Sequence, residues 1–190
     1  MLGSTIGWAA VAAALLYLVL TYNALVTLKN GVLRAWSNID VLLKQRHDEV
    51  PKLVEVCKAY MQFERDTLER VMLARAGASR ARAAGDVAAL GGAESRLNAG
   101  VGRIAATVEA YPELRANRSI AQLLGRISAL ENQIGDRREL YNEYATLFNI
   151  RLERFPDVML ARVFGFVARP LLSFDAAEIA DVDVGAQFRQ

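Results

Sequence analysis

An N-terminal stretch without charged side chains constrains the fold more than any other feature of this sequence. Met1 to Leu28 contain no Asp, Glu, Lys, Arg or His, whereas charged residues recur throughout the rest of the chain. An α-helix rises about 1.5 Å per residue, so the apolar run from Ile6 to Leu28 is long enough to cross a hydrocarbon core of roughly 30 Å. The sequence therefore predicts a transmembrane anchor over residues 1–28.

Two other interpretations of this segment stay open, namely a cleaved secretory signal and a buried core helix. A signal peptide has a basic n-region, a shorter apolar core and a cleavage site of small residues. Here the Met1 amine is the only cation ahead of the apolar run, and residues 21–23 do not form such a site. We therefore expect an uncleaved single-pass anchor, with the lipid bilayer as its partner.

The basic residues nearest the anchor all follow it, and they are Lys29, Arg34, Lys44 and Arg46. Lys and Arg beside a membrane span tend to stay in the cytoplasm. This asymmetry predicts that the N-terminus lies outside and that the bulk of the chain is cytoplasmic.

Composition excludes several classes of function. The 23 Lys and Arg residues nearly balance 21 Asp and Glu residues, and the net charge of +2 is far below that of a typical nucleic-acid-binding domain. Cys57 and His47 are the only cysteine and histidine, so one chain offers no disulfide, no thiolate cluster and no Ser-His motif of a nucleophilic triad. The glycine-rich run at 100–105 lacks the βαβ context of a dinucleotide-binding loop. We therefore expect no nucleic acid, no cofactor, no metal and no catalytic residue.

Helical periodicity follows the anchor almost to the end of the chain. Apolar residues recur at spacings of three and four from Leu33 to Val71, which predicts one long helix that continues to about Ala84. Pro51 lies within this stripe without changing its phase, so we expect a kink there. Gly85 ends the helix.

Two further long helices and a short one are predicted. The second helix covers about Val87 to Ala110 and stops at Tyr111-Pro112, and the third begins at Asn117 or Ser119 and stops at Phe155-Pro156. A short helix, from Asp157 to about Gly165, comes next. The fold class is therefore all-α, with an N-terminal transmembrane helix, an elongated antiparallel bundle of three long helices, a short C-terminal helix and a tail. Pro51, Pro112 and Pro156 mark the predicted helix breaks.

Length and composition suggest one domain behind the anchor. About 160 residues remain after the anchor, which is a normal size for a single domain. We assign residues 1–28 to the anchor, 29–170 to the helical bundle and 171–190 to a tail. The tail mixes acidic and apolar residues, so it either stays loose or docks on a neighbour.

Short motifs spread along nearly the whole chain resemble the LemA family of bacterial membrane-anchored proteins. They are Tyr22-Asn23, Arg46, Val50-Pro51, Leu53-Val54, Ala110-Tyr111-Pro112, Asn117, Glu131-Asn132, Arg138, Tyr141-Asn142, Phe155-Pro156, Gly165-Phe166 and Arg169-Pro170. The resemblance implies one N-terminal span in the bacterial inner membrane, a long helical bundle and no established enzymatic activity. A relative of this family occurs among magnetosome-membrane proteins.

Charged residues on the predicted apolar faces form a candidate structural network. Arg46 and Glu64 lie near the apolar face of the first bundle helix, and Glu131 and Arg138 share the face of Ile127 and Ile134 on the third. A buried charge needs a partner, so we expect interhelical bonds that set the register of the helices. The predicted members are Arg46, Glu64, Glu131, Asn132, Arg138, Tyr141 and Asn142. The functional alternative is acid–base chemistry at Glu131 or a metal held by the carboxylates.

Three other features have a structural and a functional interpretation. His47 is either a packing residue or a pH-sensitive switch, and Cys57 on the apolar stripe is a core residue. An arginine strip is either a solvated helix face or a contact for an acidic partner. The strip consists of Arg65, Arg70, Arg75, Arg80 and Arg82.

An anchor, long amphipathic helices and the lack of a catalytic pattern favour a non-enzymatic scaffold that self-associates and organises membrane or recruits proteins. Gly3 and Gly7 have a GxxxG spacing that weakly favours pairing of spans, so we expect a homo-oligomer. The alternatives are an adaptor or sensor that presents protein partners to a membrane enzyme, and an enzyme of unknown type.

Overall fold

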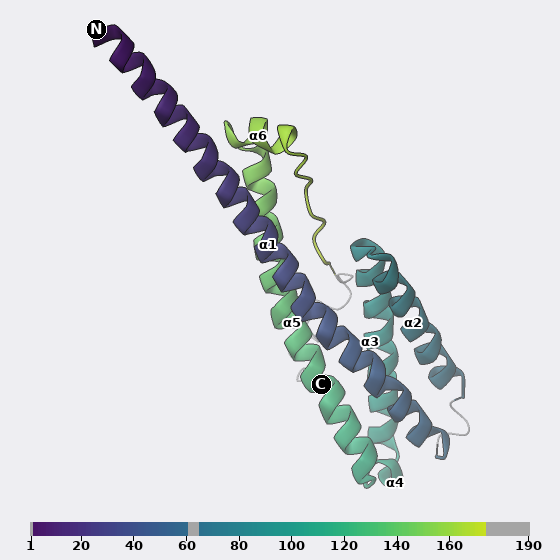
Figure 1. Ribbon diagram of the computed structural model, residues 1–190. Coiled ribbons are helices and arrows are strands. Elements are labelled where there is room, and N and C mark those ends of the chain that lie inside the picture. The colour runs from purple at the N-terminus through teal and green to yellow at the C-terminus, as the bar shows by residue number, and fades with distance from the viewer. Residues whose placement is uncertain (1, 61–64, 174–190) are drawn as a thin grey trace, which may run out of the picture. The chain divides into compact units, whose positions relative to one another are not determined.

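The computed structural model describes residues 2–60 and 65–173, and over these ranges it is all-helical (Figure 1). The helices are α1 (Leu2–Lys58), α2 (Arg65–Ala84), α3 (Val87–Ala110), α4 (Pro112–Arg115), α5 (Arg118–Glu153) and α6 (Asp157–Val163). The all-α prediction and the long apolar N-terminal helix are confirmed. Glu64 and the predicted tail beyond Ser173 lie outside the described residues.

The chain divides into two compact units. Unit 1 comprises residues 1–39 and 137–171, and unit 2 comprises residues 40–136 and 172–190. α1 and α5 contribute residues to both units, because α1 runs without a break from Leu2 to Lys58 and α5 from Arg118 to Glu153. The predicted boundary at residue 28 stays a prediction, since no helix ends there.

The predicted extent of the first long bundle helix is wrong. A continuous helix to about Ala84 was expected, but α1 ends at Lys58 and a separate helix, α2, begins at Arg65. α1 passes through Pro51 before it ends, and the Tyr60 amide then donates to the Cys57 carbonyl over 3.0 Å. The chain reverses because the apolar residues at both ends of this connection bury themselves in one core.

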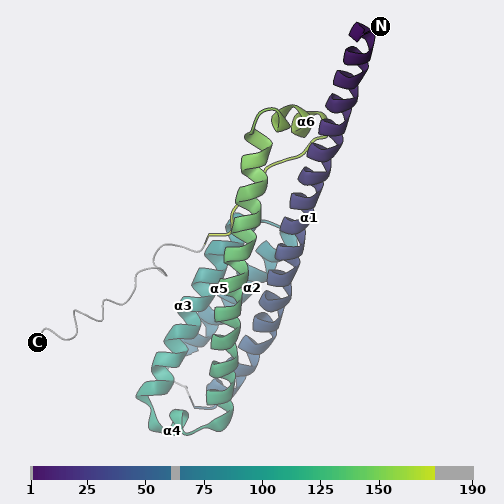
Figure 2. The ribbon, with the colours of Figure 1, turned by 90° about the vertical axis from the view of Figure 1, so that its left-hand side faces the viewer.

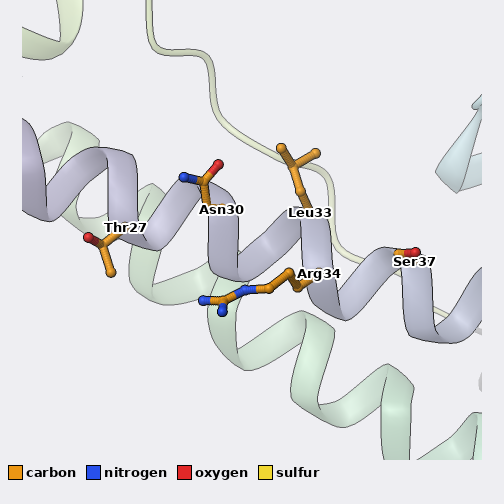
Figure 3. A pocket seen from close by; sticks show the side chains of 5 residues that line it. All are labelled: Thr27, Asn30, Leu33, Arg34 and Ser37. Atoms are coloured by element: carbon orange, nitrogen blue, oxygen red, sulfur yellow. The ribbon is translucent and has the colours of Figure 1, made fainter.

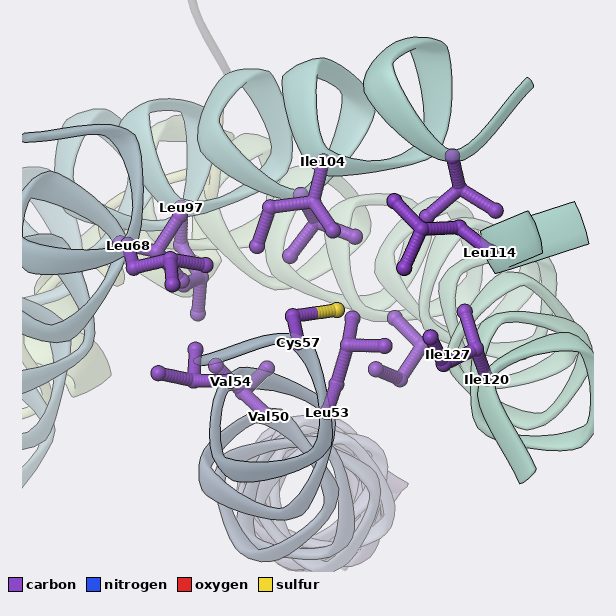
Figure 4. Packing of buried hydrophobic residues seen from close by; sticks show 13 residues of the cluster. Val50, Leu53, Val54, Cys57, Leu68, Leu97, Ile104, Leu114, Ile120 and Ile127 are labelled. Atoms are coloured by element: carbon purple, nitrogen blue, oxygen red, sulfur yellow. The ribbon is translucent and has the colours of Figure 1, made fainter. Parts of the chain in front are cut away.

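Five helical segments surround the core of unit 2. As residue numbers rise along α1 from Asp40 to His47, their partners on α2 fall from Arg82 to Arg75, so these two helices are antiparallel. The core joins residues of α1, α2, α3, α4 and the first half of α5 (Figure 4). Its members are Val50, Leu53, Val54, Cys57, Leu68, Val71, Leu97, Val101, Ile104, Val108, Leu114, Ile120 and Ile127.

Local capping explains where α3 and α5 begin. Gly85 has a φ of +67°, which favours glycine, and the Asp86 side chain accepts a bond from the Ala89 amide over 2.9 Å. The Asn117 side chain accepts from the Ser119 amide over 3.0 Å at the start of α5. Tyr111 follows α3, and Pro112 opens α4. These signals give α3 the range that the sequence predicts.

In unit 1, α1 packs antiparallel to the second half of α5. The Trp36 and Tyr141 ring centroids lie 5.5 Å apart, and Gly31 lies directly against the ring of Tyr144. Unit 1 buries residues such as Leu25 and Phe148. Since residues 31 and 36 of α1 meet residues 144 and 141 of α5, numbering again rises on one helix as it falls on the other.

α6 folds back onto α1 within unit 1 (Figure 2). The Tyr17 hydroxyl donates to Asp157 Oδ1 over 3.3 Å, and the ring centroids of Tyr22 and Phe164 are 4.8 Å apart. The segment after α6 is held on α5 by Asn149, whose amide group exchanges two hydrogen bonds of 2.8 Å with the backbone of Arg169. α6 is therefore tied to one level of the first helix.

The first part of α1 is long and apolar enough to cross a membrane. The helix has a mean hydropathy of 2.0 in its apolar window, and only 11% of that window is buried. Every side chain from Thr5 to Leu20 is exposed, whereas Thr21 and Leu25 are buried in unit 1. This exposed apolar surface supports membrane anchoring.

Candidate functional site

A buried ionic cluster lies where α1, α3 and α5 meet in unit 2. Arg46 Nη2 pairs with Glu94 Oε2, and these two side chains are 1% and 0% exposed. Arg46 Nη1 also donates to Asn98 Oδ1 and lies 3.6 Å from Glu131 Oε1. One guanidinium thus joins two helices that face it, α3 and α5.

Helical spacing places both charges of the central pair among apolar residues. Arg46 interrupts the buried stripe of α1, which consists of Leu43, Arg46, Val50, Leu53 and Cys57. Glu94 likewise interrupts the buried stripe of α3, which consists of Leu90, Glu94, Leu97, Val101, Ile104 and Val108. Spacings of three and four keep each stripe on one face, so the two charges face one another inside the core.

The two ring nitrogens of His47 contact different helices, one reaching Glu94 of α3 and the other Ser79 of α2. His47 Nε2 lies 2.9 Å from Glu94 Oε1, Ser79 Oγ lies 3.2 Å from His47 Nδ1, and Arg75 Nε donates to the His47 carbonyl over 2.7 Å. The neutral tautomer with hydrogen on Nε2 satisfies both ring contacts, because Nε2 donates to the carboxylate and Nδ1 accepts from the hydroxyl.

Burial lowers the pKa of His47 to about 4, and the neighbouring charges of Arg46, Arg75 and Arg82 act in the same direction. The charge of Asp48 acts in the opposite direction, but it is the smallest of these influences on the pKa of His47. His47 is therefore uncharged at neutral pH. Both of its ring nitrogens are occupied by Glu94 and Ser79, so neither is available to take a proton from a substrate.

A second ion pair lies at the edge of the cluster. Arg82 Nε and Nη2 donate to the two carboxylate oxygens of Asp40, the second over 2.9 Å. This hydrogen bonding holds the pKa of Asp40 below its usual value and raises that of Arg82. Both side chains are partly exposed, so the pair contributes less than the buried one.

Neither a reactive thiol nor a metal-binding cluster is found among the described residues. Burial raises the pKa of the Cys57 thiol to about 11, so it is a protonated core residue rather than a nucleophile. Among residues 2–60 and 65–173, no three His, Cys, Asp or Glu side chains converge in a way that could hold a metal ion.

A shallow, open depression of about 520 Å³ lies along α1 in unit 1 (Figure 3). It is lined by Thr27, Asn30, Leu33, Arg34 and Ser37. All five residues come from one helix face and none is acidic. The depression has neither an acid–base pair nor a nucleophile activated by a base.

The sequence-predicted network residues are divided among different surroundings. Arg46 and Glu131 come together in unit 2. Tyr141 lies in unit 1 instead, where it is buried and its hydroxyl donates to the Pro170 carbonyl over 2.8 Å. Arg138 and Asn142 are half-buried, and Asn132 is exposed.

Sequence reasoning missed Glu94 and Asn98 and named no partner for His47, which it left as either a packing residue or a pH-sensitive switch. The stripe of α3 contains the signal for Glu94, because a single acidic residue there replaces an apolar one at helical spacing. Asn98 follows Glu94 by four residues and is thus on the same side of the helix. The identity of their partners depends on how the helices meet, which spacing alone does not give.

The arginine strip is not one continuous surface. Arg65, Arg70 and Arg80 are exposed on α2, but Arg75 and Arg82 are half-buried and bind His47 and Asp40 within unit 2. Two of the five side chains proposed for partner contact are thus engaged inside the unit.

Comparisons with known proteins identify several relatives of this chain. Magnetosome protein MamQ 1 and MamQ 2 of Paramagnetospirillum magneticum are each 24% identical over 179 residues, which cover 82% of this chain and 66% of the relative. Protein LemA of Metamycoplasma hominis is 28% identical over 164 residues, or 85% of this chain and 72% of that protein. The chain spans slightly less than two thirds of the length of the magnetosome relatives.

The LemA family pattern extends over most of the chain. It matches residues 35–186, which include the ionic cluster, the helices of unit 2, α5 and α6. The motif-based resemblance is confirmed by this match and by the similarity to a protein named LemA. This protein belongs to the LemA family.

Proposed function

We propose that this protein is a membrane-anchored, non-enzymatic helical scaffold that self-associates to organise membrane or to recruit proteins. The observation that carries the proposal is the composition of α1. Its first part exposes an apolar surface of membrane-spanning length, and its last part supplies Arg46 to a buried ionic cluster. A chain with an anchor and a charged cluster buried inside its core is suited to contact rather than turnover.

Exposed apolar residues in unit 1 support self-association. Leu33 on α1 and Leu147 and Ile150 on α5 are 45%, 47% and 58% exposed. Gly7 has open space around it, and small residues on an apolar helix permit close approach of a second span. A second copy of the chain would cover such surfaces.

The relatives supply the cellular setting of the proposal. Three of them are named as magnetosome proteins of magnetic bacteria. We extend from them a role at a bacterial membrane, with the inner membrane as the site of the anchor. Lys29 and Arg34 follow the span, which favours an external N-terminus and a cytoplasmic bulk of the chain.

The mass of the full-length protein in mild detergent tests the proposal. A scaffold runs as a large homo-oligomer, whereas the adaptor hypothesis predicts a monomer or dimer and would be favoured over ours by that result. Ile150→Glu in unit 1 should reduce the oligomer, because it places a charge on the proposed contact surface. Leu73→Glu is the matched control, since Leu73 is an exposed apolar residue of α2.

A further inference from the structure

α6 and the residues around it expose an unusual amount of apolar surface. The most exposed side chains are Phe155 (77%), Met159 (62%), Val163 (78%), Phe164 (55%) and Val167 (72%). Met159 and Val163 are four residues apart on α6, so they lie on the same side of that helix, and Phe155 lies in the turn just before it. Soluble surfaces seldom gather apolar groups in this way unless something covers them.

The acidic residue of α6 is turned away from this surface. Asp157 is buried, accepts from Tyr17 over 3.3 Å and binds Arg151 Nε over 2.7 Å. α6 contains no other acidic residue, and its remaining charge is the exposed Arg162. The outward side of α6 therefore combines apolar groups with a positive charge, which suits an anionic lipid surface.

Contacts within unit 1 fix the level of α6 along the span. Tyr17 and Tyr22 of α1 hold Asp157 and Phe164, respectively. The helix from Leu2 to Leu20 is about 28 Å long at 1.5 Å per residue, close to the thickness of a hydrocarbon core. Thr21 is the first buried residue after it, so the lipid-exposed part of α1 ends beside α6.

We propose that α6 and its flanking residues are a second membrane contact, which lies in the interface of the leaflet where the lipid-exposed part of α1 ends. Met159, Val163 and Phe164 enter the boundary between headgroups and acyl chains. Arg162 faces the lipid phosphates. Tyr17 and Tyr22 sit at the same boundary, where amphipathic aromatic residues are favoured.

This inference rests on the membrane anchoring of the proposed function and adds the depth and orientation of unit 1. The bilayer is the occupant because the α6 surface continues the exposed surface of α1 at the residues where they touch.

Fluorescence quenching in nanodiscs tests the position of α6. The full chain carries Cys57→Ala and one introduced cysteine, which is labelled with an environment-sensitive dye. It is reconstituted at one copy per disc, in discs of phosphatidylcholine and phosphatidylglycerol. Val163→Cys and Met159→Cys probe α6, Leu16→Cys probes the anchor, and Leu73→Cys on α2 is the exposed control. Circular dichroism checks that each variant keeps its helix content.

We expect the dyes at residues 16, 159 and 163 to show blue-shifted emission and to lose most of their intensity when the disc contains doxyl-labelled lipid. The dye at residue 73 should be quenched by aqueous iodide instead. If the α6 dyes behave like that at residue 73 while residue 16 stays lipid-quenched, the α6 inference is wrong and anchoring stands. Iodide quenching at residue 16 would overturn both.

The number of copies per disc separates lipid from a second copy. Dyes at residues 159 and 163 should give the same emission and lipid quenching with one copy or several. Protection that arises only with several copies would show that α6 is an interface between chains, and it would overturn the proposal.

Discussion

Unit 1 and unit 2 use the same two helices for opposite purposes. In unit 2, α1 buries the charged Arg46 against Glu94 within an apolar core. In unit 1, α1 exposes apolar residues such as Leu16 and Val19, and Trp36 packs against Tyr141. An apolar exterior favours a lipid environment, whereas a buried ion pair requires an exact partner. One helix can therefore expose apolar residues along one part and bury a paired charge along another, because its sequence changes along its length.

The largest expected effect comes from removing the acid of the buried cluster. Glu94→Leu leaves Arg46 buried without its carboxylate and should lower the free energy of unfolding of unit 2 by about 3–5 kcal/mol. Pulsed maleimide labelling of Cys57 across a urea series measures it, because this single thiol lies in the core of unit 2. Tryptophan fluorescence, which reports on unit 1 because Trp8 and Trp36 both belong to it, should change much less.

The double variant Arg46→Met with Glu94→Leu is the control for this prediction. Replacing both charges with apolar groups should restore most of the lost stability, since the fully buried charges are gone and the remaining carboxylate, Glu131, is 32% exposed. Equal labelling of Cys57 in the wild type and in Glu94→Leu would show that the pair does not hold unit 2 together.

Acidification should weaken unit 2 through His47. The pKa of His47 falls from 6.5 in the unfolded chain to about 4 in the folded protein, so between these values the unfolded chain binds the extra proton. The free energy of unfolding should therefore decrease as the pH falls from 6.5 to 4, by about 1–3 kcal/mol in total. Urea unfolding followed by circular dichroism at several pH values measures the decrease.

His47→Gln separates this effect from the titration of carboxylates. The amide keeps hydrogen-bonding groups but does not titrate, so the stability of the variant should depend less on pH in this window. Parallel pH profiles for wild type and variant would contradict the assignment of a depressed pKa to His47.

Glycine substitutions compare close packing in unit 1 with open space in unit 2. A Cβ at Gly31 would lie 2.8 Å from Tyr144 Cδ1, so Gly31→Ala should displace the ring and lower the thermal stability of unit 1 by about 1 kcal/mol. Gly77→Ala on α2 meets nothing within 4 Å and should stabilise its helix by about 1 kcal/mol. Thermal melts followed by Trp36 fluorescence and by circular dichroism detect the two shifts, and a stabilising Gly31→Ala would contradict the close contact.

The smallest effect is expected at the edge of the cluster. Arg82→Ala removes the partly exposed pair with Asp40 and should cost less than about 1 kcal/mol, with a smaller cost in high salt. Lys58→Ala, at an exposed pair with Glu55, should leave the Cys57 labelling midpoint unchanged. A cost at Arg82 comparable to that at Glu94 would mean that the two pairs act as one buried unit.

Local signals in the sequence predicted much of the fold. Asp86 and Tyr111-Pro112 set the limits of α3 because they cap and interrupt the helix whatever surrounds them. The reversal between α1 and α2 was missed because residues 59–64 contain neither Gly nor Pro. Cys57 and Leu68 are also separated by three helical turns, so they would lie on the same face of a single continuous helix. The apolar pattern therefore does not reveal that the helix is interrupted between them.

The candidate site was predictable as a set of positions and not as a set of pairs. Arg46 and Glu131 stand out because each replaces an apolar residue on a stripe. The partners of Arg46 depend on how three helices pack. This packing places the Glu94 carboxylate closer to Arg46 than the Glu131 carboxylate is. The apolar surface of α6 was visible in the sequence, but its level beside Tyr17 and Tyr22 required the structure.

We propose that the apolar helix stays on the protein and holds it in a membrane. Alkaline carbonate extraction of cell membranes, followed by the intact mass of the extracted and retained protein, tests it most directly. We predict that the protein remains in the membrane pellet with residues 1–28 still attached. A carbonate-soluble protein whose intact mass corresponds to a chain that starts after Leu28 would contradict this proposal.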